Sequence, residues 1–304
     1  MAGAGKRAEG VLTGFILGDS LGIATQGLSP DDVLSSCGMI TGLGPGRPAD
    51  DAASLPAGSV SFLTEQMLQA ACFIGSAKKN DLQRSATAHP TQIPDPQSAD
   101  RAAGMAGAAE VIGWATAAVP RAIAQSFAVA DMPDGVTTRT ETEAALLIAN
   151  TISAAIDGES VADAIDIGLA EAAGAPPRGR WTGEASVVAR ALQALEWADN
   201  LREAELVEHL GTVVGVSAAP GDAVPAALVI ARAFADDPYR GLCAIAQMGG
   251  ETCLIGALAG AALGASCGPD GFPSDVTGEV DRMGEVAGVA ARLLSHRGTM
   301  SRRP

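Results

Sequence analysis

The sequence predicts an all-α fold, formed as a single compact multi-helix domain. Apolar residues recur mainly at the three- and four-residue spacing of helices, and neither a hairpin signal nor a fixed-period repeat stands out. Aromatic residues make up only 3% of the chain, whereas Gly and Ala are abundant. Small side chains let helix backbones approach closely, and β-branched and aromatic residues are what strands favour. With 304 residues and 47% hydrophobic residues, the chain can bury a large core.

Helices are expected wherever the periodic segments lie between Gly, Pro and polar stretches. Two intervening segments, 38–58 and 78–100, are rich in Gly, Pro or polar residues and are expected to be loops. Gly256, Gly260 and Gly264 share one helix face, which predicts a neighbouring helix at close range. The expected helices are 11–22, 64–75, 101–119, 121–130, 141–157, 161–173, 184–200, 201–210, 225–235, 239–248 and 251–265.

The domain is expected to cover residues 11–295, with an N-terminal tail at 1–10 and a C-terminal tail at 296–304. The formal net charge of -15 argues against nucleic acid and anionic membranes as partners, because both attract basic surfaces. The longest apolar run, Cys253–Cys267, is too short to span a bilayer, which takes about 20 residues. We therefore expect a cytoplasmic protein with a small-molecule ligand, and a homo-oligomer is compatible with the sequence.

Four segments, in order, resemble the ADP-ribosylglycohydrolase family. Residues 14–22 read GFILGDSLG, where the family has G-x-x-x-G-D-A-L-G. Residues 56–66 read PAGSVSFLTEQ, where the family has P-x-G-x-x-T-D-D-T-E-Q. Residues 223–227 read AVPAA in place of S-V-P-A-A, and residues 249–257 read GGETCLIGA in place of G-G-D-x-D-T-I-x-A. Together these segments extend across most of the chain and imply the family's helical fold.

The resemblance implies hydrolysis of a glycosidic bond to ADP-ribose at a centre of two magnesium ions. The family's ligands are the T-D-D residues and the two Asp and the Thr of D-x-D-T, a set of hard oxygen donors that suits magnesium. Here only Ser61 and Glu251 keep oxygen atoms at those positions. We therefore expect the dinuclear magnesium site to be lost, with no metal or other cofactor. The remaining four positions hold Phe62, Leu63, Cys253 and Leu254.

Two interpretations of the apolar replacements remain open. Phe62, Leu63 and Leu254 either fill a cavity left after loss of function or line a pocket remade for a more apolar ligand. Carboxylates without their metal repel one another, so their replacement by apolar residues stabilises a metal-free fold.

Three residues are candidates for catalysis. Glu65 and Glu251 are the carboxylates available for general acid–base work, although each also suits the first turn of a helix on electrostatic grounds. Cys253 lies near a helix N-terminus, where a thiolate nucleophile is favoured, but it equally suits burial as a small apolar residue.

The substrate-binding candidates surround the two motifs. Asp19 is also expected to make local hydrogen bonds that orient the next segment, and Trp181 either stacks on a ligand base or covers an edge of the core. The full set is Asp19, Ser61, Phe62, Leu63, Thr64, Leu254 and Trp181.

Three functions follow as hypotheses. The first is metal-independent chemistry or binding on a glycoside, a nucleotide-derived compound or another small molecule, with a role in specialised metabolism. The second is a catalytically inactive pseudoenzyme that binds a ligand or a protein. The third is residual ADP-ribosyl hydrolase activity.

Overall fold

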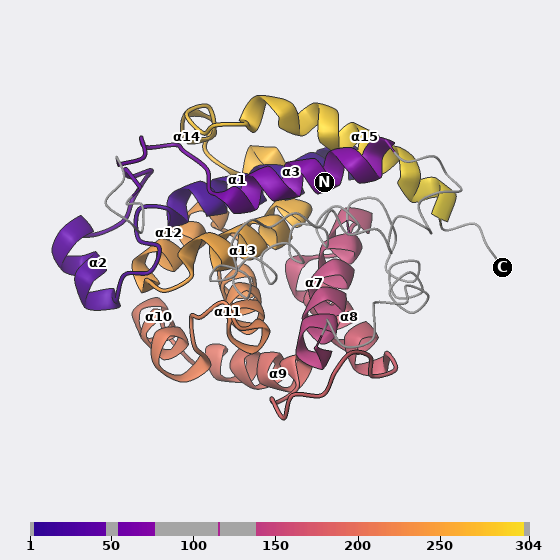
Figure 1. Cartoon of the computed structure of the whole chain (residues 1–304), viewed down its shortest axis with the longest axis horizontal. Helices are drawn as coiled ribbons and strands as arrows, with labels where there is room; N and C mark the ends of the chain where they lie inside the picture. The colour runs from indigo at the N-terminus through magenta and orange to yellow at the C-terminus, as the bar shows by residue number, and fades with distance from the viewer. Residues whose placement is uncertain (1–2, 47–53, 77–114, 116–137, 301–304) are drawn as a thin grey trace.

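The structure is a computed structural model that describes residues 3–46, 54–76, 115 and 138–300. The predicted helices at 101–119 and 121–130, and the predicted loop at 78–100, lie outside the described residues apart from Ala115. The all-α prediction is confirmed, because the described residues form helices and show only two isolated β-bridges, Gly46–Leu55 and Thr138–Arg180 (Figure 1).

The helices follow the predicted order along the chain. A π-helical turn, Leu210–Val214, continues α10, and short helical turns precede α15. The described helices are α1 (Ala4–Gly22), α2 (Pro30–Cys37), α3 (Phe62–Ser76), α7 (Arg139–Asp157), α8 (Val161–Gly174), α9 (Val187–Ala198), α10 (Glu203–His209), α11 (Pro220–Ala233), α12 (Pro238–Met248), α13 (Thr252–Cys267), α14 (Ser274–Thr277) and α15 (Val286–Met300).

Several helix ends differ from the sequence prediction. Helix α1 begins at Ala4 rather than at residue 11 and buries Arg7 in its first turns, where the guanidinium donates to the backbone oxygens of Ala155 and Glu159. Helix α11 begins at Pro220, so Pro225 lies inside the helix and not at its start. Proline suits the first turn, where backbone N–H groups lack helical partners, and sequence alone does not choose between two such prolines.

Helices α2 and α15 were not predicted. The side chain of Ser29 caps α2 by accepting a hydrogen bond from the backbone of Asp32, and Pro30 follows in the first turn. Helix α15 packs beside α1 and α3 and buries Val286, Val289 and Leu293. Both helices have weak signals because each offers only a narrow apolar stripe between polar residues.

Helices α1 and α13 form the central pair of the fold. The glycine stripe predicted on α13 faces a second stripe on α1, and the two backbones touch without side chains between them. A Cβ atom on Gly18 would lie 2.0 Å from the oxygen of Gly256, and one on Gly10 would lie 2.1 Å from that of Gly264. Because low residue numbers on α1 meet high ones on α13, the helices are antiparallel. The close helix packing expected at Gly256, Gly260 and Gly264 is therefore confirmed.

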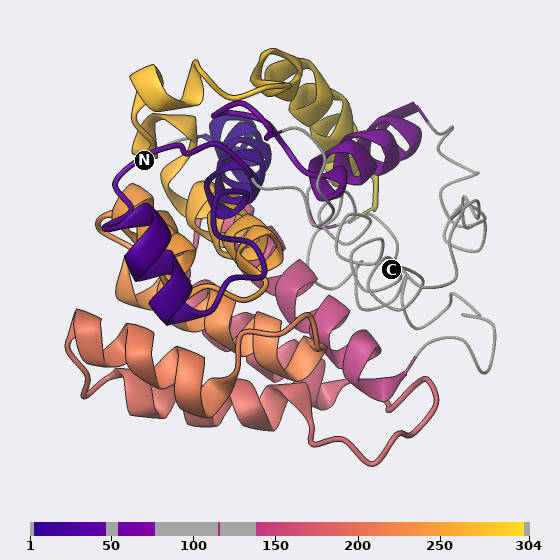
Figure 2. The same ribbon diagram turned by 60° about the vertical axis from the view of Figure 1, so that its left-hand side comes forward.

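The other helices form layers around this pair. Helices α3 and α15 pack against α1 on one side, and α7, α11 and α12 pack against α13 on the other. Helix α8 packs beside α7, and α9 packs against α11 at the lower edge in Figure 1. In the turned view of Figure 2 the salmon-coloured helices again lie at the lower edge. None of the described helices is both long and apolar enough to cross a membrane. The arrangement brings the end of α1 and the beginnings of α3 and α13 to one place.

Candidate functional site

Asp19 joins α1 to the beginning of α3. Its side chain is fully buried, and its Oδ2 accepts hydrogen bonds from the backbone N–H of Ser61 at 2.9 Å and from the hydroxyl of Thr64 at 2.6 Å. The expected local hydrogen bonding of Asp19 is thus wrong, because its partners lie in a distant segment of the chain. We call the meeting point of Asp19 with residues 61–65 and 251–254 the helix junction.

Burial and hydrogen bonding act in opposite directions on Asp19. Burial raises the pKa of its carboxyl above the ordinary 3.8, because the charged form loses its hydration. Hydrogen bonds from Ser61, Thr64 and the Cys253 thiol favour the charged form and lower the pKa, but burial is the larger effect. The thiol belongs to the first turn of α13, so Asp19 contacts both motif segments.

Gln26 closes the junction on the α13 side. Its Oε1 accepts the backbone N–H of Cys253 at 2.9 Å, and its Nε2 donates to Oε2 of Glu251 at 2.6 Å. The hydroxyl of Thr252 donates to the backbone oxygen of Gly22 at 2.8 Å. The first N–H groups of a helix need external acceptors, and Gln26 supplies one here. Sequence analysis did not single out Gln26 because nothing local links it to α13.

The three residues at the family's T-D-D position have different environments. The Oγ of Ser61 accepts the backbone N–H of Leu63 at 3.1 Å. Leu63 is fully buried in the hydrophobic core, whereas Phe62 is 57% exposed. Neighbouring positions in the first turn of a helix point in different directions, which places one apolar replacement in the core and the other at the surface.

Residues Cys253 and Leu254 at the start of α13 are both buried, and Leu254 belongs to the hydrophobic core. Glu251 precedes this helix and is half-buried. At the start of α13, the catalytic candidate Glu251 is therefore partly accessible to solvent, whereas the candidate Cys253 is buried.

Glu65 lies on the outer side of the junction. Its Oε2 forms an ion pair with Nη2 of Arg282 at 2.9 Å, and both side chains are partly exposed. Arg282 comes from the segment between α14 and α15, far along the chain. It is a second junction residue that sequence analysis missed.

A family model for ADP-ribosylglycohydrolase matches residues 2–303. The chain belongs to the ADP-ribosylglycohydrolase family. Over 145 residues it is 34% identical to the uncharacterized protein YegU of Escherichia coli (strain K12). This alignment covers 47% of this chain and 43% of YegU. The aligned region thus spans less than half of that relative. A solved structure titled ADP-ribosylglycohydrolase-related protein complex matches with a TM-score of 0.62 at 18% identity, covering 96% of this chain and 98% of that one. At 18% sequence identity, this match shows that the two chains share a fold.

Trp181 lies apart from the other candidates of this ADP-ribosylglycohydrolase fold. It is 69% exposed, in the loop that precedes α9. Arg139 donates its backbone N–H to the oxygen of Arg180 at 3.1 Å, and Thr140 and Thr182 both bond to Glu184, so the loop is tied to the start of α7. In Figures 1 and 2 this loop lies at the lower edge, away from α1 and α3. Sequence analysis offered two roles for Trp181, and its 69% exposure argues against the one in which it covers an edge of the core.

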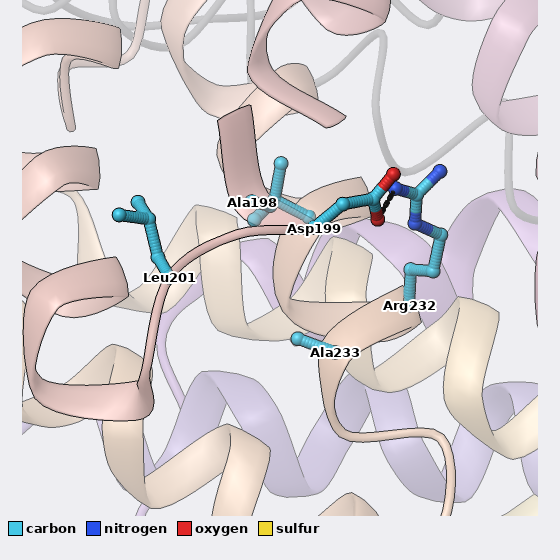
Figure 3. A pocket seen from close by; sticks show the side chains of 6 residues that line it. Ala198, Asp199, Leu201, Arg232 and Ala233 are labelled. Carbon is cyan, nitrogen blue, oxygen red and sulfur yellow. Dashed lines mark hydrogen bonds and ion pairs between the residues drawn. The ribbon is translucent and has the colours of Figure 1, made fainter. Parts of the chain in front are cut away.

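A hollow of about 260 Å³ lies at the end of α9, beside α11 (Figure 3). Arg232 and Asp199 form an ion pair at its rim, and Arg232 also donates to the backbone oxygen of Leu195 at 2.8 Å. None of the candidate residues lines it. The lining residues are Ala198, Asp199, Leu201, Val229, Arg232 and Ala233.

Proposed function

We propose that this ADP-ribosylglycohydrolase-family protein works without the dinuclear magnesium site and uses the helix junction to bind a small molecule. The ligand class is a glycoside, a nucleotide-derived compound or another small molecule that presents sugar hydroxyls. Two candidates for chemistry at the junction, Glu65 and Glu251, are carboxylates with access to solvent. Cys253 is the third candidate, and its burial requires an opening motion before it meets a ligand.

The side chains present at the family's ligand positions support the loss of the metal site. Paired magnesium ions need several hard oxygen donors that are free to coordinate. Of the two positions that keep an oxygen atom, the Oγ of Ser61 accepts the backbone N–H of Leu63, and the Oε2 of Glu251 accepts a hydrogen bond from Gln26. Leu63 and Leu254 offer no donor atom, and a thiol such as Cys253 is too soft a ligand for magnesium. No group of three or more His, Cys, Asp or Glu side chains in the described part of the chain is arranged to hold a metal.

The surface of the first turn of α3 supports binding of a sugar-containing ligand. Phe62 and Glu65 are three residues apart on one helix, so they lie on the same face. Phe62 is 57% exposed and Glu65 is half-exposed, which places an apolar ring beside a carboxylate. Sugars combine apolar C–H faces with hydroxyl donors, so this pairing suits them. The proposal includes an apolar ligand pocket at the helix junction, to which Phe62 would contribute its ring.

The burial of Leu63, Thr64, Cys253 and Leu254 favours a second candidate, an inactive pseudoenzyme. Leu63 and Cys253, which stand at Asp positions of the family's motifs, pack within the protein interior together with Leu254 at a Thr position and Thr64, as expected of residues that fill a former metal site. Such a protein would bind a ligand or a partner protein without turnover.

Metal content and turnover test the proposal together. Purified protein would be analysed for magnesium and manganese and assayed with ADP-ribosyl arginine, with and without added divalent ions or EDTA. We expect less than one tightly bound ion per chain and no metal-dependent turnover. Two bound ions with metal-dependent hydrolysis would instead establish the residual hydrolase.

Binding separates the two metal-free candidates. Isothermal titration calorimetry with ADP-ribose, adenosine and ribose would detect a small-molecule ligand, and product analysis by chromatography would detect turnover. Binding with slow, EDTA-resistant cleavage would support metal-independent chemistry. Binding without product would support the pseudoenzyme, and no binding of any of these compounds would contradict the small-molecule proposal for this class.

A further inference from the structure

The carboxylate of Glu65 is held by a guanidinium that is itself fixed at two points. Arg282 donates through Nη2 to Oε2 of Glu65 at 2.9 Å, and its Nη1 forms an ion pair with Oε1 of Glu285 at 2.8 Å. A planar guanidinium bound on two sides has a defined orientation, unlike a flexible ammonium group. Glu65 is therefore presented in one geometry at the edge of the helix junction.

The backbone of Arg282 is strained in making this contact. Its φ is 68° and its ψ is -5°, and it is the one residue other than Gly with positive φ among the described residues. A side chain makes this left-handed conformation costly, and the ion pair, with both partners about 40% exposed, adds little stability in return. Strained residues of this kind concentrate at binding and catalytic sites, where geometry outweighs stability.

The segment that carries Arg282 is docked on the loop that leads into α3. Asp281 donates its backbone N–H to the oxygen of Gly58 at 2.9 Å. A Cβ atom on Gly58 would lie 2.2 Å from the oxygen of Glu279, so only Gly allows this approach. Val280 and Val286 are buried on either side of Arg282. The guanidinium is thus fixed relative to Glu65 by the backbone as well as by its ion pairs.

We propose that Arg282 is the positioning residue of the helix junction, holding Glu65 as a hydrogen-bond acceptor for a ligand hydroxyl. The guanidinium occupies Oε2, and Oε1 has no hydrogen-bond partner within the described residues. An ionised carboxylate only accepts hydrogen bonds, so the free oxygen selects hydroxyl donors such as those of a sugar. This inference rests on the proposed function, and it assigns Glu65 to ligand orientation.

Isothermal titration calorimetry with ADP-ribose as the probe compares the full-length wild type with Arg282→Gly, Arg282→Lys and a control variant, and Arg282→Ala serves as a reference in denaturation. Arg282→Gly and Arg282→Ala both remove the guanidinium, but Gly adopts a positive φ without strain. The denaturant midpoint of Arg282→Gly should therefore equal or exceed that of Arg282→Ala. We expect the Kd for ADP-ribose to rise roughly tenfold or more in Arg282→Gly, as for loss of a charge-assisted hydrogen bond. Arg282→Lys keeps the charge and should recover part of this loss. Glu205→Gln, the matched control, breaks the exposed ion pair between Arg202 and Glu205 at the start of α10 and should change the Kd less than about twofold.

A double variant distinguishes positioning from direct contact with the ligand. If Arg282 acts through Glu65, Glu65→Gln combined with Arg282→Gly should weaken binding no more than Glu65→Gln alone. Additive losses, or unchanged binding in Arg282→Gly, would overturn the inference and leave the proposed function in place. If the wild type binds no ADP-ribose, the proposed function fails for this probe. A crystal structure of Arg282→Gly then decides the inference, because an unchanged, well-ordered Glu65 side chain would show that Arg282 does not hold it.

Discussion

A Cβ atom on Gly14 would lie 1.9 Å from the carbonyl oxygen of Gly260, so the backbones of α1 and α13 are in direct contact at this pair. The reverse contact is equally close, with a Cβ atom on Gly260 lying 2.0 Å from the oxygen of Gly14. Moving either helix away would also break the neighbouring contacts of Gly10 with Gly264 and of Gly18 with Gly256. This central contact fixes where the end of α1 and the beginning of α13 meet, and therefore where the helix junction forms.

Gly14→Ala should destabilise the protein strongly. The new methyl group meets backbone, which cannot rotate away, so we expect the free energy of unfolding to fall by about 3 kcal/mol or more. Gly5→Ala on the same helix is the control, because its Cβ would meet only Leu294 Cδ2 at 4.0 Å. That substitution should stabilise by about 0.5–1 kcal/mol through helix propensity. Urea denaturation measures both, and an unchanged midpoint for Gly14→Ala would contradict the backbone contact.

Asp19 should make the stability depend on pH in a defined direction. Because burial raises its folded pKa above 3.8, the unfolded chain releases this proton first as the pH rises. The folded state then binds more protons, and the contribution of Asp19 to stability falls until the pH passes the folded pKa. Asp19→Asn removes this titration, so wild-type stability should fall relative to the variant as the pH rises above the ordinary carboxyl pKa of 3.8.

Chemical denaturation of the wild type and Asp19→Asn across this pH range measures the effect. Thr64→Val is the companion variant: it removes a hydrogen bond that lowers the pKa of Asp19 and should extend the fall in stability to higher pH. Parallel pH profiles for wild type and Asp19→Asn would show that the Asp19 pKa is not raised in the folded state.

Aspartate should be tolerated at position 62 and not at position 63. Leu63→Asp places an unpaired carboxylate in the hydrophobic core, so we expect a loss of at least about 3 kcal/mol. Phe62→Asp changes an exposed residue in the first turn of α3, where a negative charge is favourable, and should stay within about 1 kcal/mol of the wild type. Thermal unfolding with and without magnesium measures both. Recovery of Leu63→Asp by magnesium would show that the metal site can still assemble.

Gln26→Leu should weaken the contact between the turn after α1 and the start of α13. It leaves the backbone N–H of Cys253 and the carboxylate of Glu251 without the Gln26 amide, which we expect to lower the free energy of unfolding by about 1–3 kcal/mol. Gln26→Glu keeps an acceptor for Cys253 but places a second carboxylate beside Glu251. Its stability should therefore improve on acidification relative to Gln26→Leu, as followed by denaturant titration. Equal stability of wild type and Gln26→Leu would exclude a role for the amide.

The sequence by itself determined the class of fold and the family. Helical periodicity does not depend on which segments meet, so α7, α8, α12 and α13 were predicted nearly to their ends. The glycine stripe at Gly256, Gly260 and Gly264 likewise predicted a close neighbour, because every fourth residue returns to the same face of a helix. The replacements at residues 61–63 and 251–254 were also visible directly in the sequence.

Only the tertiary structure decided which distant residues share the candidate site. Asp19 meets Ser61 and Thr64, and Glu65 meets Arg282, through contacts that no local pattern specifies. It also separated Leu63, which is buried, from Phe62, which is exposed, although the sequence presents them as equivalent apolar replacements. Local sequence sets the period of a helix and the faces it offers. Which face is covered, and by which segment, depends on how the whole chain packs.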